Sequence, residues 1–350
     1  TSLLLVNNDK GKRYFEKLKN NFIMRSHVPL KHAIKYNSNI VKPSKKHTQR
    51  QRFFYNIDKY TLENNIENCL NDRADAGIMN LFYSKNYGAV LTAYAMQEVI
   101  EQLGFSAKIV NYTPEKKESS YFNTRFRNKY LNLTKRLITD KDLFGLNFNI
   151  HCFITGSDQV FRSSILSDYN KYLLDFVSPQ NKKIAFSASF GIGTPEIQKE
   201  MSSQDMQAYT NSLKSFDFVS TREDSGVEIC KKYFNTEAHW VIDPVFLLDS
   251  IKYDELINNC KNIDDKYKNS IVTYILDNNE KVEKLLNQMS KKLDKKIQQL
   301  SAENDTDVEE WLYAFKNASY IITDSFHGCC FALIFKKPFL CIKNKQRGNA

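Results

Sequence analysis

From Ala76 onward, short apolar runs alternate with longer segments in which apolar residues recur at helical spacing. Short apolar runs between turn residues predict buried strands, and apolar residues three and four positions apart predict amphipathic helices. The first unit has the apolar run Ala76–Leu81, the polar loop Tyr83–Gly88, the helical segment Ala89–Leu103 and the run Ala107–Tyr112. This β–α–β order is typical of a doubly wound parallel sheet.

The same alternation continues in two series. The rest of the first series predicts strands at His151–Thr155, Lys183–Phe190, Phe218–Thr221 and Ala238–Ile242, and helices at Pro195–Leu213 and Ser225–Phe234. The second series predicts strands at Ser270–Leu276, Lys296–Leu300, Tyr320–Thr323 and Phe339–Ile342, and helices at Lys281–Leu293, Val308–Asn317 and Cys329–Phe335.

Two such series predict an α/β fold with two Rossmann-like domains that face a cleft, residues 76–248 and 249–350. We expect the boundary between Leu248 and Asn269. The basic, aromatic segment Tyr121–Asn149 interrupts the first series. We expect it to form an insertion or helical excursion over the functional site. Because the chain stops at Ala350, shortly after the strand-like run Phe339–Ile342, we expect the second domain to be truncated there.

Residues 1–75 have a different character. Leu3–Val6 predicts a short strand and Lys12–Lys19 a helix. The segment holds 15 Lys/Arg against 7 Asp/Glu, so most of the net charge of +10 belongs to it. We interpret it as a solvated basic segment, with attraction to an anionic membrane surface as the alternative. No zinc-finger spacing or helix-turn-helix signal accompanies it, so nothing else supports binding of nucleic acid.

Composition narrows the class of protein. Hydrophobic residues make up 42% and aromatic residues 13% of the chain, which argues against disorder. No apolar run reaches 18 residues and no signal peptide is visible, although the chain begins at Thr1 rather than Met. The seven cysteines are odd in number and form no C-x-x-C pair, which favours neither a disulfide framework nor a zinc site. We expect a cytoplasmic protein that needs no metal and no cofactor.

The strongest candidate cluster for chemistry is Asp324-Ser325-Phe326-His327-Gly328, on the turn from a predicted strand into a helix. Ligands of doubly wound sheets bind at the carboxyl ends of strands, where the next helix offers amide N–H groups to an anion. Gly328 would allow backbone to approach that anion, and His327 is suited to acid catalysis near neutral pH. The alternative is a capping turn, with Ser325 or Asp324 as the cap and His327 exposed.

Further clusters follow other predicted strands. Gly156-Ser157-Asp158-Gln159 offers Asp158 as a base or sugar ligand, or as a helix cap. In Ser220-Thr221-Arg222-Glu223-Asp224, the planar guanidinium of Arg222 suits a carboxylate or phosphate, or pairs with Glu223 or Asp224 on the surface. Asp243 precedes Pro244 after a strand, and we expect it to be structural rather than catalytic.

The motifs NYGAVLTAYAMQ, GSDQVFR, SFG, STREDSG, DPVFLL and IITDSFHGCCFALIFKKPF occur in one order between about residues 76 and 350. Together they resemble the polysaccharide pyruvyl transferase family. The run LLLVNNDKGKRYFEKLK resembles, more weakly, the tail of the deazaflavin-reducing hydrogenase β-subunit family, and we interpret residues 1–75 as a fusion remnant without catalysis.

The resemblance to pyruvyl transferases implies a fold like that of B-type glycosyltransferases. It also implies transfer of the enolpyruvyl group of phosphoenolpyruvate onto two hydroxyls of a surface-polysaccharide sugar, as a ketal, with release of phosphate. The family histidine falls on His327 and a family arginine on Arg222, both similar to residues that hold phosphoenolpyruvate. A second arginine of some members falls on Ser325, so one anion contact differs here; Arg347 or residues beyond Ala350 are candidates to compensate.

We therefore expect His327 as the acid and Asp158 as the base or orienting group. The expected substrate-binding residues are Arg222, Ser325, Gly328, Ser157, Gln159 and Asn86. The expected partners are phosphoenolpyruvate and a saccharide acceptor, lipid-linked and reached at the inner face of the membrane. The alternative functions are a B-type glycosyltransferase that uses a nucleotide sugar and a non-catalytic binding protein.

Overall fold

The computed structural model describes residues 9–18, 73–113, 121–260, 265–301 and 306–344. The expected strand near the N-terminus and most of the basic segment lie outside these ranges. Apart from residues 73–75, the described part of that segment is helix α1, Asp9–Leu18, which confirms the prediction of a helix there.

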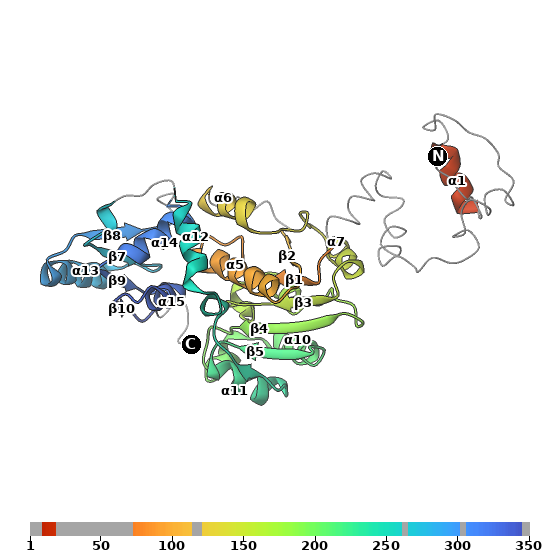
Figure 1. The fold of residues 1–350 in the computed structure, drawn as a ribbon. Helices are drawn as coiled ribbons and strands as arrows, with labels where there is room; N and C mark the ends of the chain where they lie inside the picture. The colour runs from red at the N-terminus through yellow and green to blue at the C-terminus, as the bar shows by residue number, and fades with distance from the viewer. Residues whose placement is uncertain (1–8, 19–72, 114–120, 261–264, 302–305, 345–350) are drawn as a thin grey trace.

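The first sheet has six parallel strands in the order β2–β1–β3–β4–β5–β6 (Figure 1). Its strands are β1 Ala76–Met79, β2 Ala107–Ile109, β3 Cys152–Thr155, β4 Lys182–Ala188, β5 Phe218–Thr221 and β6 His239–Trp240. The α-helices of this series are α5 Tyr87–Gln102, α6 Tyr121–Tyr130, α7 Asp140–Gly145, α8 Tyr169–Tyr172, α9 Ile197–Glu200, α10 Ser203–Leu213 and α11 Asp224–Phe234.

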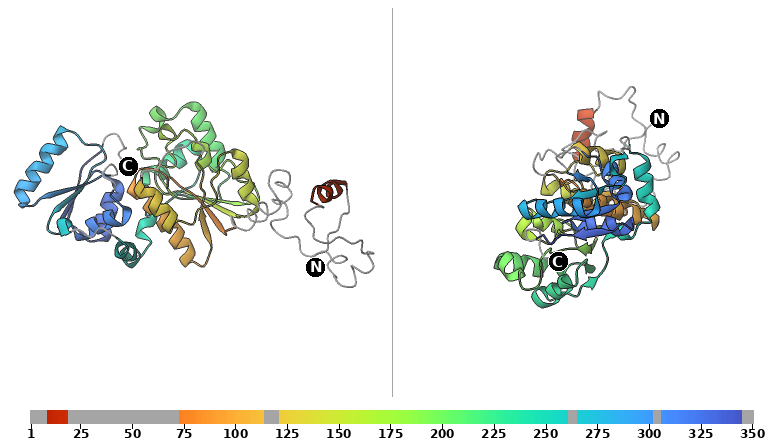
Figure 2. Two further views of the ribbon diagram at one scale, coloured as in Figure 1. Left: turned by 90° about the horizontal axis from the view of Figure 1, so that it is seen from above. Right: turned by 90° about the vertical axis from the view of Figure 1, so that its left-hand side faces the viewer.

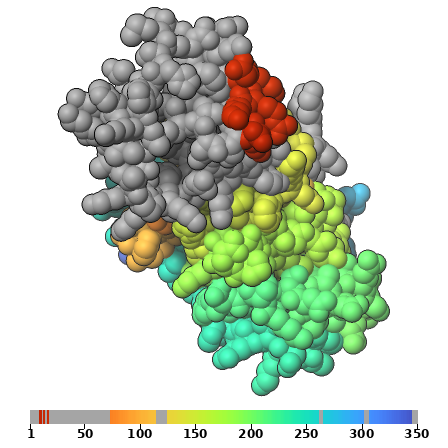
Figure 3. Space-filling model, turned by 90° about the vertical axis from the view of Figure 1, so that its right-hand side faces the viewer, coloured from red at the N-terminus to blue at the C-terminus, as the bar shows by residue number. Residues whose placement is uncertain are grey.

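Helix α12, Ser250–Asn258, leads to a second sheet of four parallel strands in the order β10–β9–β7–β8. Its strands are β7 Ile271–Tyr274, β8 Ile297–Leu300, β9 Tyr320–Thr323 and β10 Phe339–Cys341, and its helices are α13 Glu280–Leu293, α14 Val308–Asn317 and α15 Phe326–Ile334. Figure 2 shows this blue part beside the orange-to-green first sheet. In Figure 3, seen from the end opposite the second sheet, the coloured surface is mainly that of the first series.

These sheets confirm the predicted α/β fold with two parallel, Rossmann-like parts. The division into domains 76–248 and 249–350 stays a prediction. The segment predicted as one helix, Pro195–Leu213, is two helices, because Ser202 caps α10 in a capping box with Asp205. Helix α6 confirms the helical part of the expected excursion, but it packs against α5 and α14, and none of residues 121–149 lines the pocket described below.

In both sheets, the side on which successive strands are added reverses after the second strand. The second strand of each series lies on one side of the first, and the later strands lie on the other side, so β1/β3 and β7/β9 are the switch points. Loops that leave the carboxyl ends of strands on either side of a switch point diverge and leave a crevice. The topology therefore places the loops after β1, β3, β7 and β9 where a ligand can bind.

The largest hydrophobic core contains residues from both series. Trp311 of α14 is fully buried at its centre, with ring centroids 3.9 Å from Phe315 and 5.4 Å from Tyr87 of α5. Tyr274 of β7 makes edge contacts with both Tyr87 and Trp311. The hydroxyl of Tyr87 donates a hydrogen bond of 2.7 Å to the carbonyl of Thr306, which ties α5 to the second series.

We predict that Trp311→Ala lowers the free energy of unfolding by about 3–5 kcal/mol, because it removes the largest buried ring of this core. Trp240→Ala is the matched control: that side chain is 68% exposed, so the loss is less than about 1 kcal/mol. Urea denaturation followed by circular dichroism measures both. Equal losses in the two variants would contradict the central position of Trp311.

Candidate active site

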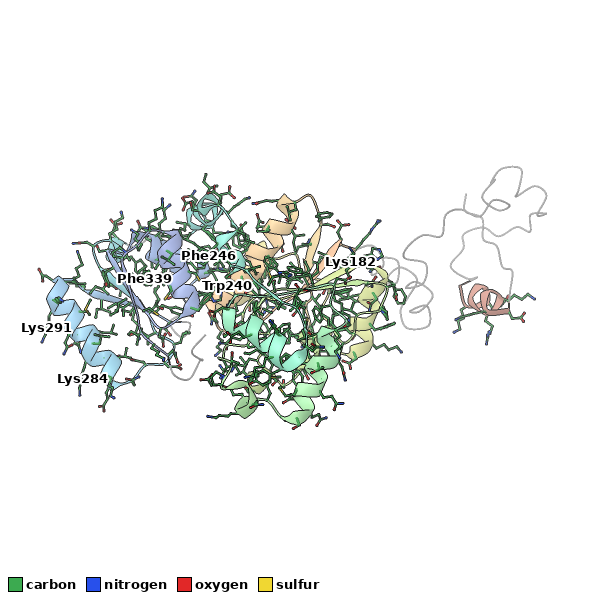
Figure 4. All side chains as sticks on the ribbon, turned by 90° about the horizontal axis from the view of Figure 1, so that it is seen from below. Lys182, Trp240, Phe246, Lys284, Lys291 and Phe339 are labelled. Carbon is green, nitrogen blue, oxygen red and sulfur yellow. The ribbon has the colours of Figure 1, made fainter. Side chains whose placement is uncertain are left out.

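A pocket of about 770 Å³ lies at the carboxyl ends of strands from both sheets. Residues that follow β1, β3, β4, β5, β7, β9 and β10 contribute to its lining. Residues of the two switch points thus face one space, as the topology predicts. In Figure 4, Trp240 and Phe246 lie near the junction of the two halves, while Lys284 and Lys291 of α13 point away from it.

The carboxylate of Asp243 is buried beneath this pocket. Its Oδ1 accepts a hydrogen bond of 3.1 Å from the amide of Val245, so it caps the 3-10 helix Pro244–Phe246. Its Oδ2 lies 2.8 Å from Ser157 Oγ, 3.2 Å from Arg222 Nη1 and 3.6 Å from His327 Nε2. Burial by itself would raise the pKa of Asp243, but the close approach and charge of His327, with the charge of Arg222, hold that pKa well below its usual range.

The side chain of Arg222, directly after β5, is only 7% exposed, so it is not a surface side chain. Its guanidinium lies 3.1 Å from Asp158 and 3.2 Å from Asp243, and Glu223 is 3.9 Å away. Burial would lower the pKa of Arg222, but these carboxylates raise it. The guanidinium also lies 4.1 Å from the ring centroid of Phe326, so both charge pairs and an aromatic face hold it in place.

His327 lies in the first turn of α15 and is 2% exposed, although it still contributes to the pocket lining. Its Nε2 is 2.9 Å from the hydroxyl of Thr92 on α5. A Cβ on Gly88 would lie 2.2 Å from His327 Nδ1. Only a glycine at position 88 therefore lets α5 and the histidine ring approach this closely.

The turn before α15 is a cap. Ser325 Oγ accepts a hydrogen bond of 3.3 Å from the amide of Gly328, and Asp324 accepts bonds from the amides of Leu276 and Asp277. A Cβ on Gly328 would lie 2.3 Å from Thr323 Oγ1, so close packing of α15 on β9 accounts for this glycine.

Residues 86–346 match the model of one protein family, which is described as polysaccharide pyruvyl transferase. The chain belongs to this family. It is therefore a transferase, and the match spans all the pocket residues after β3, β5, β9 and β10. A search of the curated proteins finds no match to the chain.

Two solved structures have a distantly similar fold. One is an α-glucosyltransferase in complex with UDP and a 13-mer DNA that contains an HMU base, with a TM-score of 0.42 and 8% identity over 71% of this chain and 72% of that chain. The other is the UDP-GlcNAc 2-epimerase of Neisseria meningitidis bound to UDP-GlcNAc, with a TM-score of 0.41 and 11% identity over 77% of this chain and 82% of that chain.

Six residues expected at the site of this pyruvyl transferase line the pocket together: Asn86, Asp158, Gln159, Arg222, Ser325 and His327. Asn86 also caps α5, because its Oδ1 accepts a hydrogen bond of 2.9 Å from the amide of Gly88. The other two expected residues, Ser157 and Gly328, are not among the lining residues. Ser157 is fully buried and lies against Asp243 instead.

The sequence did not indicate three residues that the structure places at this site, Thr92, Lys85 and Lys343, and it indicated Asp243 only as a structural residue. Asp243 and Thr92 lie beside His327, and Lys85 and Lys343 line the pocket from the two sheets. Lys85 and Lys343 come shortly after predicted strands, and this position could have indicated them as residues of the pocket. Thr92 lies inside a helix, and no sequence pattern indicates that it meets His327, 235 positions later.

Within the described residues, no group of three or more His, Cys, Asp or Glu residues is placed to hold a metal ion. No helix in these same ranges combines the length and apolar character needed to cross a membrane.

We predict that Gly88→Ala lowers the free energy of unfolding by about 1–3 kcal/mol, because the new methyl group overlaps the His327 ring. Gly145→Ala is the control. A Cβ at Gly145 meets no atom within 4 Å, so alanine there leaves stability unchanged or raises it by about 0.5–1 kcal/mol. Chemical denaturation of both variants measures the difference, and equal stability would mean that the ring has room to move.

Proposed function

We propose that this pyruvyl transferase moves the enolpyruvyl group of phosphoenolpyruvate onto a sugar of a surface polysaccharide, as a ketal, and releases phosphate. The observation that carries the proposal is the His327–Asp243 pair, at 3.6 Å, beneath a pocket that also contains Arg222, Lys85 and Lys343. An acid next to several cations suits a donor that must be protonated and carries a phosphate and a carboxylate.

The cations of the pocket differ in how much of their charge is already paired. Arg222 is bound to two carboxylates, so part of its charge is neutralised within the protein. Lys85 and Lys343 are exposed, and neither makes an ion pair with the residues that the structure describes. We therefore assign the phosphate of the donor chiefly to these two lysines, with the first turn of α15 adding the positive end of a helix dipole.

The proposed chemistry balances without a cofactor. His327 gives a proton to the methylene carbon of the donor, which makes the adjoining carbon electrophilic. One sugar hydroxyl adds to that carbon, the bond from carbon to the phosphate oxygen breaks, and the second hydroxyl then adds to close the ketal. Of the two protons that the hydroxyls release, one replaces the proton taken from His327 and the other leaves with phosphate.

Asp158 is the group that we propose to orient or deprotonate the acceptor hydroxyl. Its Oδ1 accepts hydrogen bonds from Arg222 and from the amide of Gln159. Its Oδ2 makes no hydrogen bond among the described residues, and the side chain lines the pocket. The carboxylate is thus held by one oxygen while the other is left for a substrate hydroxyl.

We predict that His327→Gln lowers kcat for phosphate release from phosphoenolpyruvate by about a hundredfold or more, the scale of a lost general acid. Arg222 and the two lysines remain, so donor binding changes only modestly. The control is His239→Gln, because His239 is exposed, stacks on Phe218 and does not line the pocket. The assay is phosphate release with lipid-linked saccharide acceptors, and near-normal turnover of folded His327→Gln would remove His327 from the proton transfer.

We also predict that Lys85→Ala and Lys343→Ala each raise KM for phosphoenolpyruvate about tenfold or more, because a charged hydrogen bond to phosphate is worth about 1.5–3 kcal/mol. Lys284→Ala is the control, since Lys284 is exposed on α13 and points away from the pocket (Figure 4). Phosphate release at varied phosphoenolpyruvate concentration measures KM, and isothermal titration with phosphoenolpyruvate and with nucleotide sugars measures donor choice. Turnover of a nucleotide sugar, with none of phosphoenolpyruvate, would instead identify a glycosyltransferase.

A further inference from the structure

We infer that His327 keeps a fixed proton on Nε2, held by Asp243 and Thr92, and that Nδ1 carries the proton that is transferred. Asp243 and Thr92 are then positioning residues, which act on the reaction through His327. This inference rests on the proposed function, since it names the atom that delivers the proton to the donor.

The hydroxyl of Thr92 determines the tautomer of the ring. It donates its single proton to the carbonyl of Gly88 at 2.8 Å, and it also lies 2.9 Å from His327 Nε2. A hydroxyl with its proton engaged can only accept from a second partner. Nε2 must therefore carry a hydrogen and donate it, which makes Nε2–H the tautomer of the neutral ring.

Asp243 reinforces the same assignment. Its Oδ2 is 3.6 Å from Nε2, and its side chain is fully buried, so the negative charge acts through a medium of low polarity. The other charged groups near the pair are Arg222, which binds Asp243, and Asp158 and Glu223, which lie against Arg222. From α5, the ring meets the neutral Thr92 and Gly88.

Nδ1 is the nitrogen left for the substrate. Among the described residues it makes no hydrogen bond; the backbone of Gly88 lies against this edge of the ring, and His327 contributes to the pocket lining. When the ring is an imidazolium, the N–H bond at Nδ1 breaks, its electron pair stays on nitrogen, and a C–H bond forms at the donor's methylene carbon. A proton released by the acceptor hydroxyl restores Nδ1–H. Throughout this cycle the Nε2 proton stays in place, and the Asp243 carboxylate balances the imidazolium charge.

The direct test is the tautomer of His327 in the full chain labelled with ¹⁵N-histidine. Long-range ¹H–¹⁵N spectra distinguish Nε2–H from Nδ1–H, and loss of one of the six histidine signals in His327→Gln identifies the residue. We expect Nε2–H in the wild-type chain. An Nδ1–H signal would overturn the inference, whatever the substrate of the enzyme proves to be.

Asp243→Asn tests the positioning role. Its carbonyl oxygen keeps the bond from the amide of Val245, so its NH₂ group takes the place of Oδ2 and faces Nε2. Thr92 still accepts from Nε2 while the new NH₂ group opposes it, so we expect a mixture of the two tautomers, and kcat to fall about a hundredfold with KM for phosphoenolpyruvate nearly unchanged. A normal tautomer together with normal kcat would overturn the role of Asp243.

Thr92→Val and Thr92→Ser form a matched pair that remains informative if Asp243→Asn does not fold. Valine removes the hydroxyl at nearly constant volume, so we expect a mixed tautomer and a loss of about tenfold in kcat. Serine keeps the hydroxyl and restores both. Equal kcat and equal tautomer in the two variants would contradict the role of Thr92. If the wild-type chain shows Nε2–H but releases no phosphate from phosphoenolpyruvate, the proposed function fails while the tautomer assignment stands.

Discussion

The carboxylate of Asp243, fully removed from water, is the interaction on which the rest of the site depends. A buried charge carries an effective desolvation penalty of several kcal/mol, so it persists only where partners surround it. Its partners here are Ser157 after β3, Arg222 after β5 and His327 in α15, together with the amide of Val245. The three side chains come from different parts of the chain, so the arrangement forms only when both sheets are in place.

Close approach of backbones is the second constraint, and glycines permit it. Gly88 lets α5 of the first series lie against His327 of the second, and Gly328 lets α15 pack on the end of β9. The core around Trp311 holds the same helices together from the other side. As a result, a histidine from one series meets a threonine and an aspartate from the other.

The cationic side chains of the pocket have different partners according to how deeply they are buried. The buried side chain of Arg222 already has carboxylate partners, and its main effect within the protein is to hold Asp158 and Asp243 in position. The exposed Lys85 and Lys343 keep their charge for a ligand. One site can therefore stabilise buried carboxylates and still offer unpaired positive charge at its surface, because different cations do the two things.

The sequence by itself determined the two α/β series, since alternating apolar runs and helical periodicity are local signals. Phe218–Thr221, Val308–Asn317 and Tyr320–Thr323 match the structure end to end. Polar clusters after strands also indicated six of the pocket residues, because carboxyl ends of parallel strands share one edge. Only the tertiary structure decided that the side chain of Arg222 is buried, that Ser157 faces Asp243 rather than the pocket, and that Thr92 binds His327. Those contacts join residues up to 235 positions apart, and no local pattern records which helix faces will meet.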